Sequence, residues 1–234
     1  MSGDTRTLRR DGHRIDYTLR RSRRRSIGLY LHPDGRVELR APMQCSAAEA
    51  EGFLLKKLDW LLGKQAELQA RPRPEPLRFE NGARHPYLGE RYPLRARLGP
   101  KGGEFTGGAI VLRLRRPDDP AALREALHAW YRQQARQVFA ERLAACHGAL
   151  AHWGIPLPEL GLRWMRSRWG SCSSRGRVNL NLELIKQPLA CIDYVIVHEL
   201  CHLREFNHSP RFYALMDEAL PDWRERKARL AAGT

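Results

Sequence analysis

The stretch His198-Glu199-Leu200-Cys201-His202 carries two histidines one helical turn apart, with a glutamate directly after the first. On an α-helix, residues four apart project from the same face, so both imidazole rings can reach one metal ion. This pattern is typical of zinc sites in which the intervening Glu199 reaches a water on the ion. His208, six residues further on, is the candidate third ligand. Three protein ligands leave a fourth position for water, as in a catalytic site.

The sequence around this motif predicts a buried helix followed by a tight bend. Apolar side chains lie on nearly all sides of that helix: Ile192, Tyr194, Val195, Ile196, Val197, Leu200 and Leu203. A glutamate inside such a helix needs a reason, because charged side chains are rarely buried. Ser209-Pro210 is typical of an N-cap followed by the first residue of a new helix, so His208 is expected in the bend. The alternative is a core helix with two hydrogen-bonded histidines and a surface His208.

The overall composition indicates a globular chain in a reducing compartment. With 234 residues, of which 42% are hydrophobic, the chain can form one large or two small domains with a substantial core. No apolar run is long enough to cross a bilayer, and residues 1–6 lack the apolar segment of a secretory signal. The five cysteines form no closely spaced pairs, which is typical of free thiols. The sequence therefore predicts a cytoplasmic protein without a membrane partner.

Positive charge dominates the sequence. The formal net charge is +15 and the pI is about 10.3, which favours anionic partners such as a nucleotide or nucleic acid. The densest positive run is Arg20-Arg21-Ser22-Arg23-Arg24-Arg25-Ser26, which can hold a phosphate backbone or a triphosphate. An equally open interpretation is a solvated connection between two strands, whose arginines reflect the composition of the whole chain.

The first half of the chain alternates in the manner of strands, with one helix between two groups of strands. Residues 13–40 predict a small antiparallel meander. A capping box that begins at Ser46 predicts a helix that ends near Ala70. The proline-rich segment 71–76 cannot continue that helix and predicts a short, stiff connection. Strand patterns return over residues 77–115.

A long helix opens the second half of the chain. Asp118-Asp119-Pro120 combines acidic capping residues with proline at the first helical position, and apolar residues follow with helical spacing as far as Trp153. The change from strand to helix patterns near residue 116 predicts two domains, over residues 1–116 and 117–234. The first is expected to be mostly antiparallel β with one helix. The second is expected to contain a long helix, a small sheet and the metal-binding helix, so the fold class is α+β.

The segment before the metal motif predicts two strands and a loop. Alternation of apolar residues predicts strands over 160–164 and 178–184, separated by a loop over 168–176. Pro188 is placed to begin the motif helix. The strand over 178–184 is a candidate wall of a substrate cleft, because an extended peptide can add to a free strand edge by main-chain hydrogen bonds.

Four stretches carry a likeness to a known family: Trp169-Gly170-Ser171-Cys172-Ser173, Asn179-Leu180-Asn181, Asp193–Leu203 and Asn207-His208-Ser209. They resemble the YgjP-like bacterial zinc metallopeptidases, which are relatives of the SprT-like and WLM zinc proteases. The resemblance implies a zincin-like domain with a long helix, a small sheet with an edge strand beside the cleft, and a metal-binding helix. It also implies that His198, His202 and His208 ligate Zn²⁺ and that Glu199 is the catalytic residue.

The motif and the resemblance together predict hydrolysis of peptide bonds in a peptide or protein substrate. Zinc acidifies its water, and Glu199 is expected to accept the water's proton and to deliver it to the leaving amine. The oxyanion that forms also needs donors. The candidate donors are Arg168, Arg175, Asn181, Arg204 and Tyr213. The carboxylates close enough in sequence to orient the ligating histidines are Glu205, Asp217 and Glu218.

Two other functions remain open from the sequence. The same site can act on phosphoanhydride bonds, which defines a metal-dependent nucleoside triphosphate pyrophosphatase. The sequence near the motif has no carboxylate cluster suited to magnesium, which counts against this function. Alternatively, the zinc is structural in a nucleic-acid-associated protein, which predicts a fourth protein ligand and strongly salt-dependent binding.

Overall fold

The computed structural model describes residues 3–10, 12–32, 34–70, 77–173 and 175–233. The chain divides into two compact units, residues 1–75 and 76–234. The predicted connection over 71–76 lies outside the described residues. The structure is a mixed α+β fold with several small sheets, as predicted.

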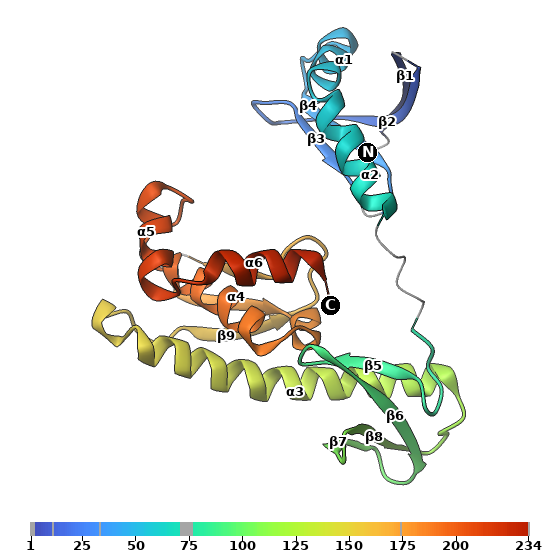
Figure 1. The fold of residues 1–234 in the computed structure, drawn as a ribbon, viewed down its shortest axis with the longest axis vertical. Helices are drawn as coiled ribbons and strands as arrows, with labels where there is room; N and C mark the ends of the chain where they lie inside the picture. The colour runs from blue at the N-terminus through green and yellow to red at the C-terminus, as the bar shows by residue number, and fades with distance from the viewer. Residues whose placement is uncertain (1–2, 11, 33, 71–76, 174, 234) are drawn as a thin grey trace. The chain divides into compact units, whose positions relative to one another are not determined.

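The first unit is a four-stranded sheet with two helices on one face (Figure 1). Its elements are β1 (Asp4–Arg10), β2 (His13–Ser22), β3 (Gly28–Leu31), β4 (Val37–Pro42), α1 (Ala47–Lys56) and α2 (Leu58–Ala70). The strand order is β1-β2-β4-β3, and β2 and β4 run parallel, so the predicted antiparallel meander is wrong. The reason is the burial of β4. Most of its residues are buried, so it occupies a central position in the sheet and pairs with a strand on each edge.

The core of the first unit lies between this sheet and its helices. Tyr17 and Leu19 of β2 and Leu39 of β4 are almost fully buried, together with Leu54 and Leu61 of the helices. The predicted capping box is present, because the Ser46 hydroxyl accepts from the Glu49 amide at 3.2 Å and the Glu49 carboxylate accepts from the Ser46 amide at 2.7 Å. The single predicted helix is divided in two at Lys57, where the backbone leaves helical geometry with φ −112° and ψ 11°.

The second unit is organised on one long helix, α3. The strands are β5 (Arg84–Tyr87), β6 (Glu90–Leu98), β7 (Gly102–Thr106), β8 (Ala109–Leu114), β9 (Glu159–Arg163), β10 (Gly170–Cys172) and β11 (Arg177–Asn181). The helices are α3 (Pro120–Ala149), the 3₁₀ helices η1 (Ala151–Trp153) and η2 (Leu182–Lys186), α4 (Leu189–Cys201), α5 (Pro210–Ala219) and α6 (Trp223–Ala232). Figure 1 shows α3 running along the unit, with the β5–β8 sheet against one part of it and α4 against another.

The predicted domain boundary near 116 falls inside this second unit. Buried residues of β6 and β8, such as Leu94 and Leu112, belong to the same core as Leu127 of α3 and Ile196 of α4. Because α3 packs on the β5–β8 sheet and on α4, it joins the two groups of elements into one body. The change of sequence pattern near 116 therefore marks the start of a helix within a unit.

The three-stranded sheet of the second unit has the order β10-β11-β9. The predicted strand over 178–184 ends at Asn181, whose side chain accepts from the Glu183 amide at 3.1 Å and caps η2. β11 lies between two strand partners, so the prediction that it offers a free edge is wrong. The short strand β10 forms within the predicted loop over 168–176 and stands at one edge of this sheet.

Each unit contains a sheet of the same topology, followed directly by a helix. The order β1-β2-β4-β3 recurs as β5-β6-β8-β7, with one parallel and two antiparallel pairs in each sheet. Val37 and Ile110 occupy equivalent positions in the two parallel pairs, and the N-cap of the next helix follows nine residues later, at Ser46 and Asp119. The chain therefore holds two copies of one module, four strands followed by a helix.

Glu38 supplies a test of the first unit's stability. Hydrogen bonds from Arg40 and His32 lower the pKa of the buried Glu38 carboxyl to about 2, and burial opposes this shift. A carboxyl with a depressed pKa stabilises the folded state above its unfolded pKa near 4.5, and that contribution declines as pH falls toward 2. We expect Glu38→Gln to cost about 1–3 kcal/mol of unfolding free energy at pH 7, because charged hydrogen bonds are lost.

The difference in unfolding free energy between Glu38→Gln and the unsubstituted chain should shrink progressively as pH falls below 4.5. Chemical denaturation followed by circular dichroism at pH 7 and pH 3 measures it. Glu67→Gln, which removes an exposed pair with Lys64, is the matched control and should cost less than about 1 kcal/mol. An equal loss for Glu38→Gln at both pH values would contradict the assigned role of this carboxylate.

Candidate metal centre

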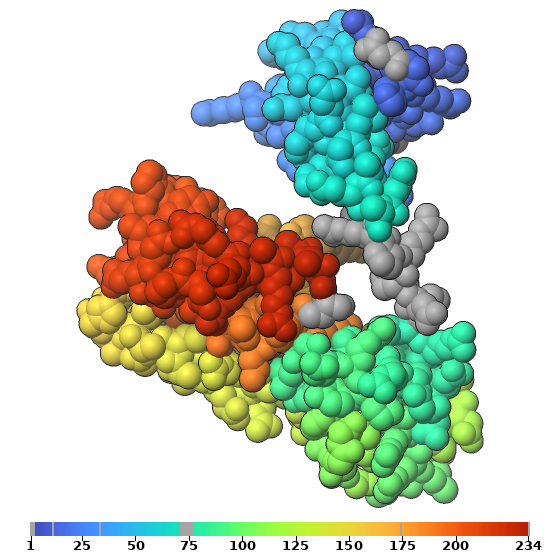
Figure 2. Space-filling model, in the orientation of Figure 1, coloured from blue at the N-terminus to red at the C-terminus, as the bar shows by residue number. Residues whose placement is uncertain are grey.

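The helix that carries the motif, α4, is buried in the second unit. Nine of its thirteen residues are buried: Cys191, Ile192, Tyr194, Val195, Ile196, Val197, Glu199, Leu200 and Cys201. The helix begins after Pro188, as predicted, and α5 and α6 pack against it, covering much of it on the face shown in Figure 2. Asp193, the fifth residue of the helix, accepts two hydrogen bonds from Arg142 of α3, each 2.7 Å long. This bidentate pair fixes the start of α4 against α3.

The structure brings the three predicted ligands together. His198 lies in the last turn of α4, His202 follows at its C-cap, and His208 lies in the bend before α5. Their candidate ligand atoms all lie within 4.8 Å of one another, and the Nε2 atoms of His198 and His208 are 3.2 Å apart. The bend is closed as predicted, because the Ser209 hydroxyl accepts from the Phe212 amide and Pro210 opens α5.

Two contacts fix the orientation of the imidazoles. The Nδ1 atom of His202 donates to the backbone carbonyl of Glu205 at 3.1 Å, which leaves Nε2 of that ring as the acceptor. Phe212, which is 1% exposed, packs under all three rings, with ring centroids 5.0 Å from His198, 4.6 Å from His202 and 4.8 Å from His208. The Phe212 ring therefore supports all three imidazoles, and a backbone carbonyl also orients that of His202.

The donor set fits a divalent ion of the zinc type. Two nitrogens bound tetrahedrally at zinc–nitrogen distances of about 2.0–2.1 Å lie roughly 3.4 Å apart, close to the separation found between His198 and His208. Burial lowers the pKa of His198 to about 3, and it also lowers the pKa of His202, so both rings are neutral near pH 7. Neutral imidazole is the form that ligates a metal. The group contains no thiolate or carboxylate among the described residues.

Glu199 lies beside this group and is almost wholly enclosed. Its side chain is 5% exposed, and burial raises the pKa of its carboxyl to about 7, against a smaller opposing effect of the Arg168 charge. Gly170 of β10 lies directly against the carboxylate. A Cβ atom built at Gly170 would lie 2.5 Å from Oε1 of Glu199 and 2.9 Å from its Cδ. The carboxylate therefore occupies space that only a glycine leaves open.

The structure separates the predicted oxyanion donors. Asn181 is buried, and its amide donates to the carbonyls of Met165 and Arg168 at 2.9 Å each, so it supports the loop before β10. The guanidinium of Arg204 lies over the Trp153 ring, 5.4 Å from its centroid. Tyr213 is 38% exposed, and its ring lies nearly parallel to His208 with centroids 6.4 Å apart.

The predicted carboxylate partners of the ligating histidines bond elsewhere. Asp217 accepts from Trp223 and Arg224, and Glu218 accepts from His152 and Trp153. Among the predicted residues Glu205 contacts a ligand, and it does so through its backbone carbonyl. A backbone acceptor has no signature in the residue type, so the sequence could not identify it.

Sequence reasoning missed three residues that shape the site. Gly170 and Phe212 contact Glu199 and the histidines directly, and Arg142 anchors α4. The position of Phe212, four residues after His208 in the first turn of α5, is the one signal that the sequence offered. The role of Gly170 depends on the close approach of β10 to α4, which no local pattern reveals.

Comparisons with known proteins place the chain in a family. No curated protein matches the chain significantly. The solved structure of the metallopeptidase zymogen of Pyrococcus abyssi abylysin is similar at 18% sequence identity, over 39% of this chain and 90% of that chain, with a TM-score of 0.36. A family model described as YgjP-like, metallopeptidase domain, matches residues 25–232, which is most of the sequence. The chain therefore belongs to the YgjP-like metallopeptidase family.

Proposed function

We propose that this protein is a zinc-dependent peptidase of the His-Glu-x-x-His type, in which His198, His202 and His208 hold Zn²⁺ and Glu199 is the general base. The observation that carries the proposal is the convergence of three imidazoles beside a buried carboxylate. The alternative of a structural zinc predicted a fourth protein ligand. The described residues supply three ligands at this position, which supports a catalytic site.

The chemistry follows from the positions of the side chains. A bound zinc ion acidifies water and polarises a carbonyl. Glu199 accepts the proton of the attacking water and later delivers it to the leaving amine. Its enclosed position beside Gly170 holds the carboxylate in one orientation, so no reorganisation is needed when the proton moves. Two of the predicted oxyanion donors lie near the site: Tyr213 is beside His208, and the charge of Arg168 acts on Glu199.

The edge strand β10 supports a peptide as the substrate. β10 pairs with β11 on one side, and among the described residues no strand pairs with its other side. An extended peptide can add to that edge by main-chain hydrogen bonds. Because Gly170 of β10 lies against Glu199, a peptide on this edge passes close to the general base.

The five cysteines are free thiols, which supports a reducing compartment such as the cytoplasm.

The first test compares the unsubstituted chain with Glu199→Gln on the same metal-loaded preparations. We expect about one zinc per chain in both proteins, since Glu199 is not a ligand, and cleavage of casein or a peptide library only by the unsubstituted protein. Elemental analysis measures the metal, and mass spectrometry measures the products. The expected loss of rate is at least 10²-fold, the lower range for removal of a general base.

A nucleoside triphosphate panel belongs in the same experiment. Release of pyrophosphate by the unsubstituted protein, abolished in Glu199→Gln and without any peptide cleavage, would assign the site to a phosphoanhydride hydrolase. Absence of stoichiometric zinc from both preparations would remove the basis of the metal centre. His208→Ala, which removes one ligand, should lower both zinc content and peptide cleavage.

Gly170→Ala tests the placement of the general base. The added methyl group would meet the Glu199 carboxylate, so we expect the side chain to shift and kcat to fall by about tenfold to 10²-fold, with the zinc content retained. Gly148→Ala is the matched control, because a Cβ at this helical position has nothing within 4 Å among the described residues. Full activity of Gly170→Ala would show that the position of Glu199 does not depend on this glycine.

A further inference from the structure

The first sheet has one covered face and one open face. Apolar side chains of β2 and β4 point toward α1 and α2 and form the core of the unit. The exposed side chains that alternate with them form the outer face, which we define by Arg9, Arg14, Asp16, Arg20, Tyr30 and Arg40. Arginine supplies most of the charge on this face.

Two pairs of arginines stand directly opposite each other on neighbouring strands. Arg9 is the cross-strand partner of Arg14, and Arg20 is the partner of Arg40. Like charges in such positions destabilise a sheet unless something offsets them. Glu38 offsets the second pair, because its carboxylate lies 3.6 Å from Nε of Arg20 and 3.0 Å from Nε of Arg40. The repulsion within the first pair is offset less, because the nearby carboxylate belongs to an exposed residue, Asp16.

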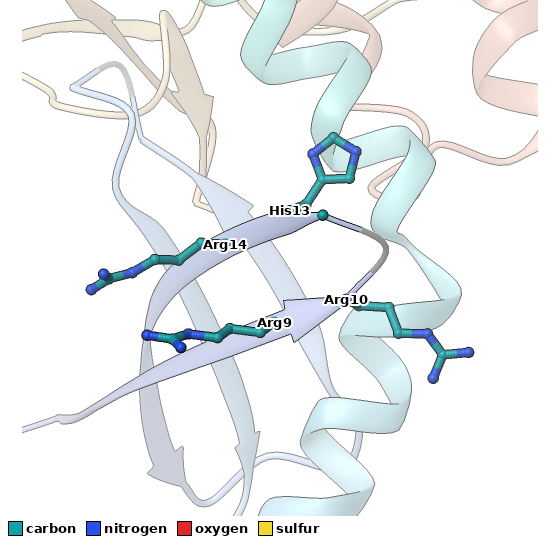
Figure 3. A pocket seen from close by; sticks show the side chains of 5 residues that line it. Arg9, Arg10, His13 and Arg14 are labelled. Carbon is teal, nitrogen blue, oxygen red and sulfur yellow. The ribbon is translucent and has the colours of Figure 1, made fainter.

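The pair of Arg9 and Arg14 borders a hollow at the tip of the β1–β2 hairpin. The hollow measures about 350 Å³ and is lined by Arg9, Arg10, Gly12, His13 and Arg14. Figure 3 shows Arg9 and Arg14 extending together on one side of the hairpin, while Arg10 extends on the other side. Asp16 accepts a hydrogen bond from Arg14 at 3.3 Å and neutralises part of this charge. The arginines beside this hollow suit a phosphate group, because guanidinium groups bind phosphate oxygens.

Tyr30 adds an aromatic surface to the same face. The residue is 39% exposed, and the guanidinium of Arg40 lies over its ring, 4.5 Å from the ring centroid. Exposed aromatic rings beside arginines are the platforms on which unpaired bases stack in proteins that bind single strands. The outer face therefore combines groups suited to phosphates with a group suited to a base.

The second copy of the module repeats most of these arginines at equivalent positions. Arg97 stands opposite Arg113 in the second sheet, as Arg20 stands opposite Arg40 in the first. Arg91 follows the turn of its hairpin by the same number of residues as Arg14. Three of the four arginines therefore recur at equivalent positions of the module, whereas Pro86 stands at the position equivalent to Arg9.

We propose that the outer face of the first sheet binds single-stranded nucleic acid, with phosphates at Arg9, Arg14 and Arg20 and a base on Tyr30. The charge of the face and its single exposed aromatic ring are complementary to a flexible strand that can present both groups. This site consists of residues of the first unit, the metal centre consists of residues of the second, and the proposal does not depend on peptide hydrolysis.

The test uses the full chain and labelled single-stranded oligonucleotides of RNA and DNA, with binding followed by fluorescence anisotropy over a range of salt concentrations. We expect saturable binding in the range of about 10⁻⁶–10⁻⁴ M near physiological salt. The double variant Arg9→Ala/Arg14→Ala should weaken binding about tenfold or more and reduce the slope of log K against log salt by about 1.4, the value for two lost phosphate contacts.

The matched control is Arg132→Ala/Arg136→Ala, which removes the same charge from the exposed side of α3. We expect it to leave the affinity and the salt slope nearly unchanged, and Asp16→Asn to strengthen binding by removing a carboxylate from the face. Equal losses of oligonucleotide affinity in the two double variants would show diffuse attraction by the net charge and would overturn the proposal. So would absence of binding by the unsubstituted chain. Thermal melts of every variant establish that it folds.

Two further measurements identify the ligand class. Tyr30→Ala should weaken binding of oligonucleotides and leave binding of inorganic polyphosphate unchanged. If it changes neither, the face binds polyanions in general and the base-stacking part is overturned. Vesicles rich in phosphatidylserine should not compete with the oligonucleotide. Binding to vesicles that exceeds binding to either oligonucleotide would assign the face to a membrane surface. Peptide cleavage by the Arg9→Ala/Arg14→Ala variant should equal that of the unsubstituted chain.

Discussion

The second unit depends on the burial of α4. This helix buries Glu199 and half-buries His198, and such groups are stable inside a protein only when their surroundings are fixed. Its neighbours supply that constraint: α3 holds Asp193 through Arg142, Phe212 of α5 supports the imidazoles, and β10 closes over the carboxylate. Because Asp193 is tied to another helix by a bidentate ion pair, α4 cannot turn about its axis without breaking a charged contact. The faces of α4 that carry His198 and Glu199 therefore keep one orientation relative to the neighbouring elements.

Local signals predicted the parts of the site that depend on local geometry. The spacing of His198 and His202, the start of α4 after Pro188 and the bend closed by Ser209 all follow from helix periodicity and capping. What the sequence did not predict depends on contacts between distant segments. Leu182 and Leu184 alternate as in a strand, yet they lie in η2, because Asn181 caps that turn. The parallel pairing of β2 with β4 is likewise set by the burial of β4, which alternation alone does not specify.

The two copies of the module explain why the domain boundary near 116 did not correspond to the compact units. In both copies a strand with the pattern Val37-Glu38-Leu39-Arg40 or Ile110-Val111-Leu112-Arg113 precedes a helix N-cap at the same distance. Recognition of this repeat in the sequence would have assigned the second sheet and the helix that follows it to one domain. That helix, α3, continues for thirty residues and joins the sheet to the metal centre, whereas the helices of the first copy are short and stay within their unit.

The hairpin turns show how one module takes two roles. In the second copy the amides of Leu88 and Gly89 donate to the carbonyls of Ile185 and Lys186 at 3.0 and 3.1 Å, just before α4 begins. Gly89 has a φ of +92° and lies so close to Pro188 that a Cβ would come within 2.7 Å of that ring. The second copy is thus part of the scaffold of the metal helix. The equivalent glycine of the first copy, Gly12, also has a positive φ, yet no described atom lies within 4 Å of its Cβ position. Within its own unit, the turn of the second copy is packed against Pro188, whereas the turn of the first copy has no such packing.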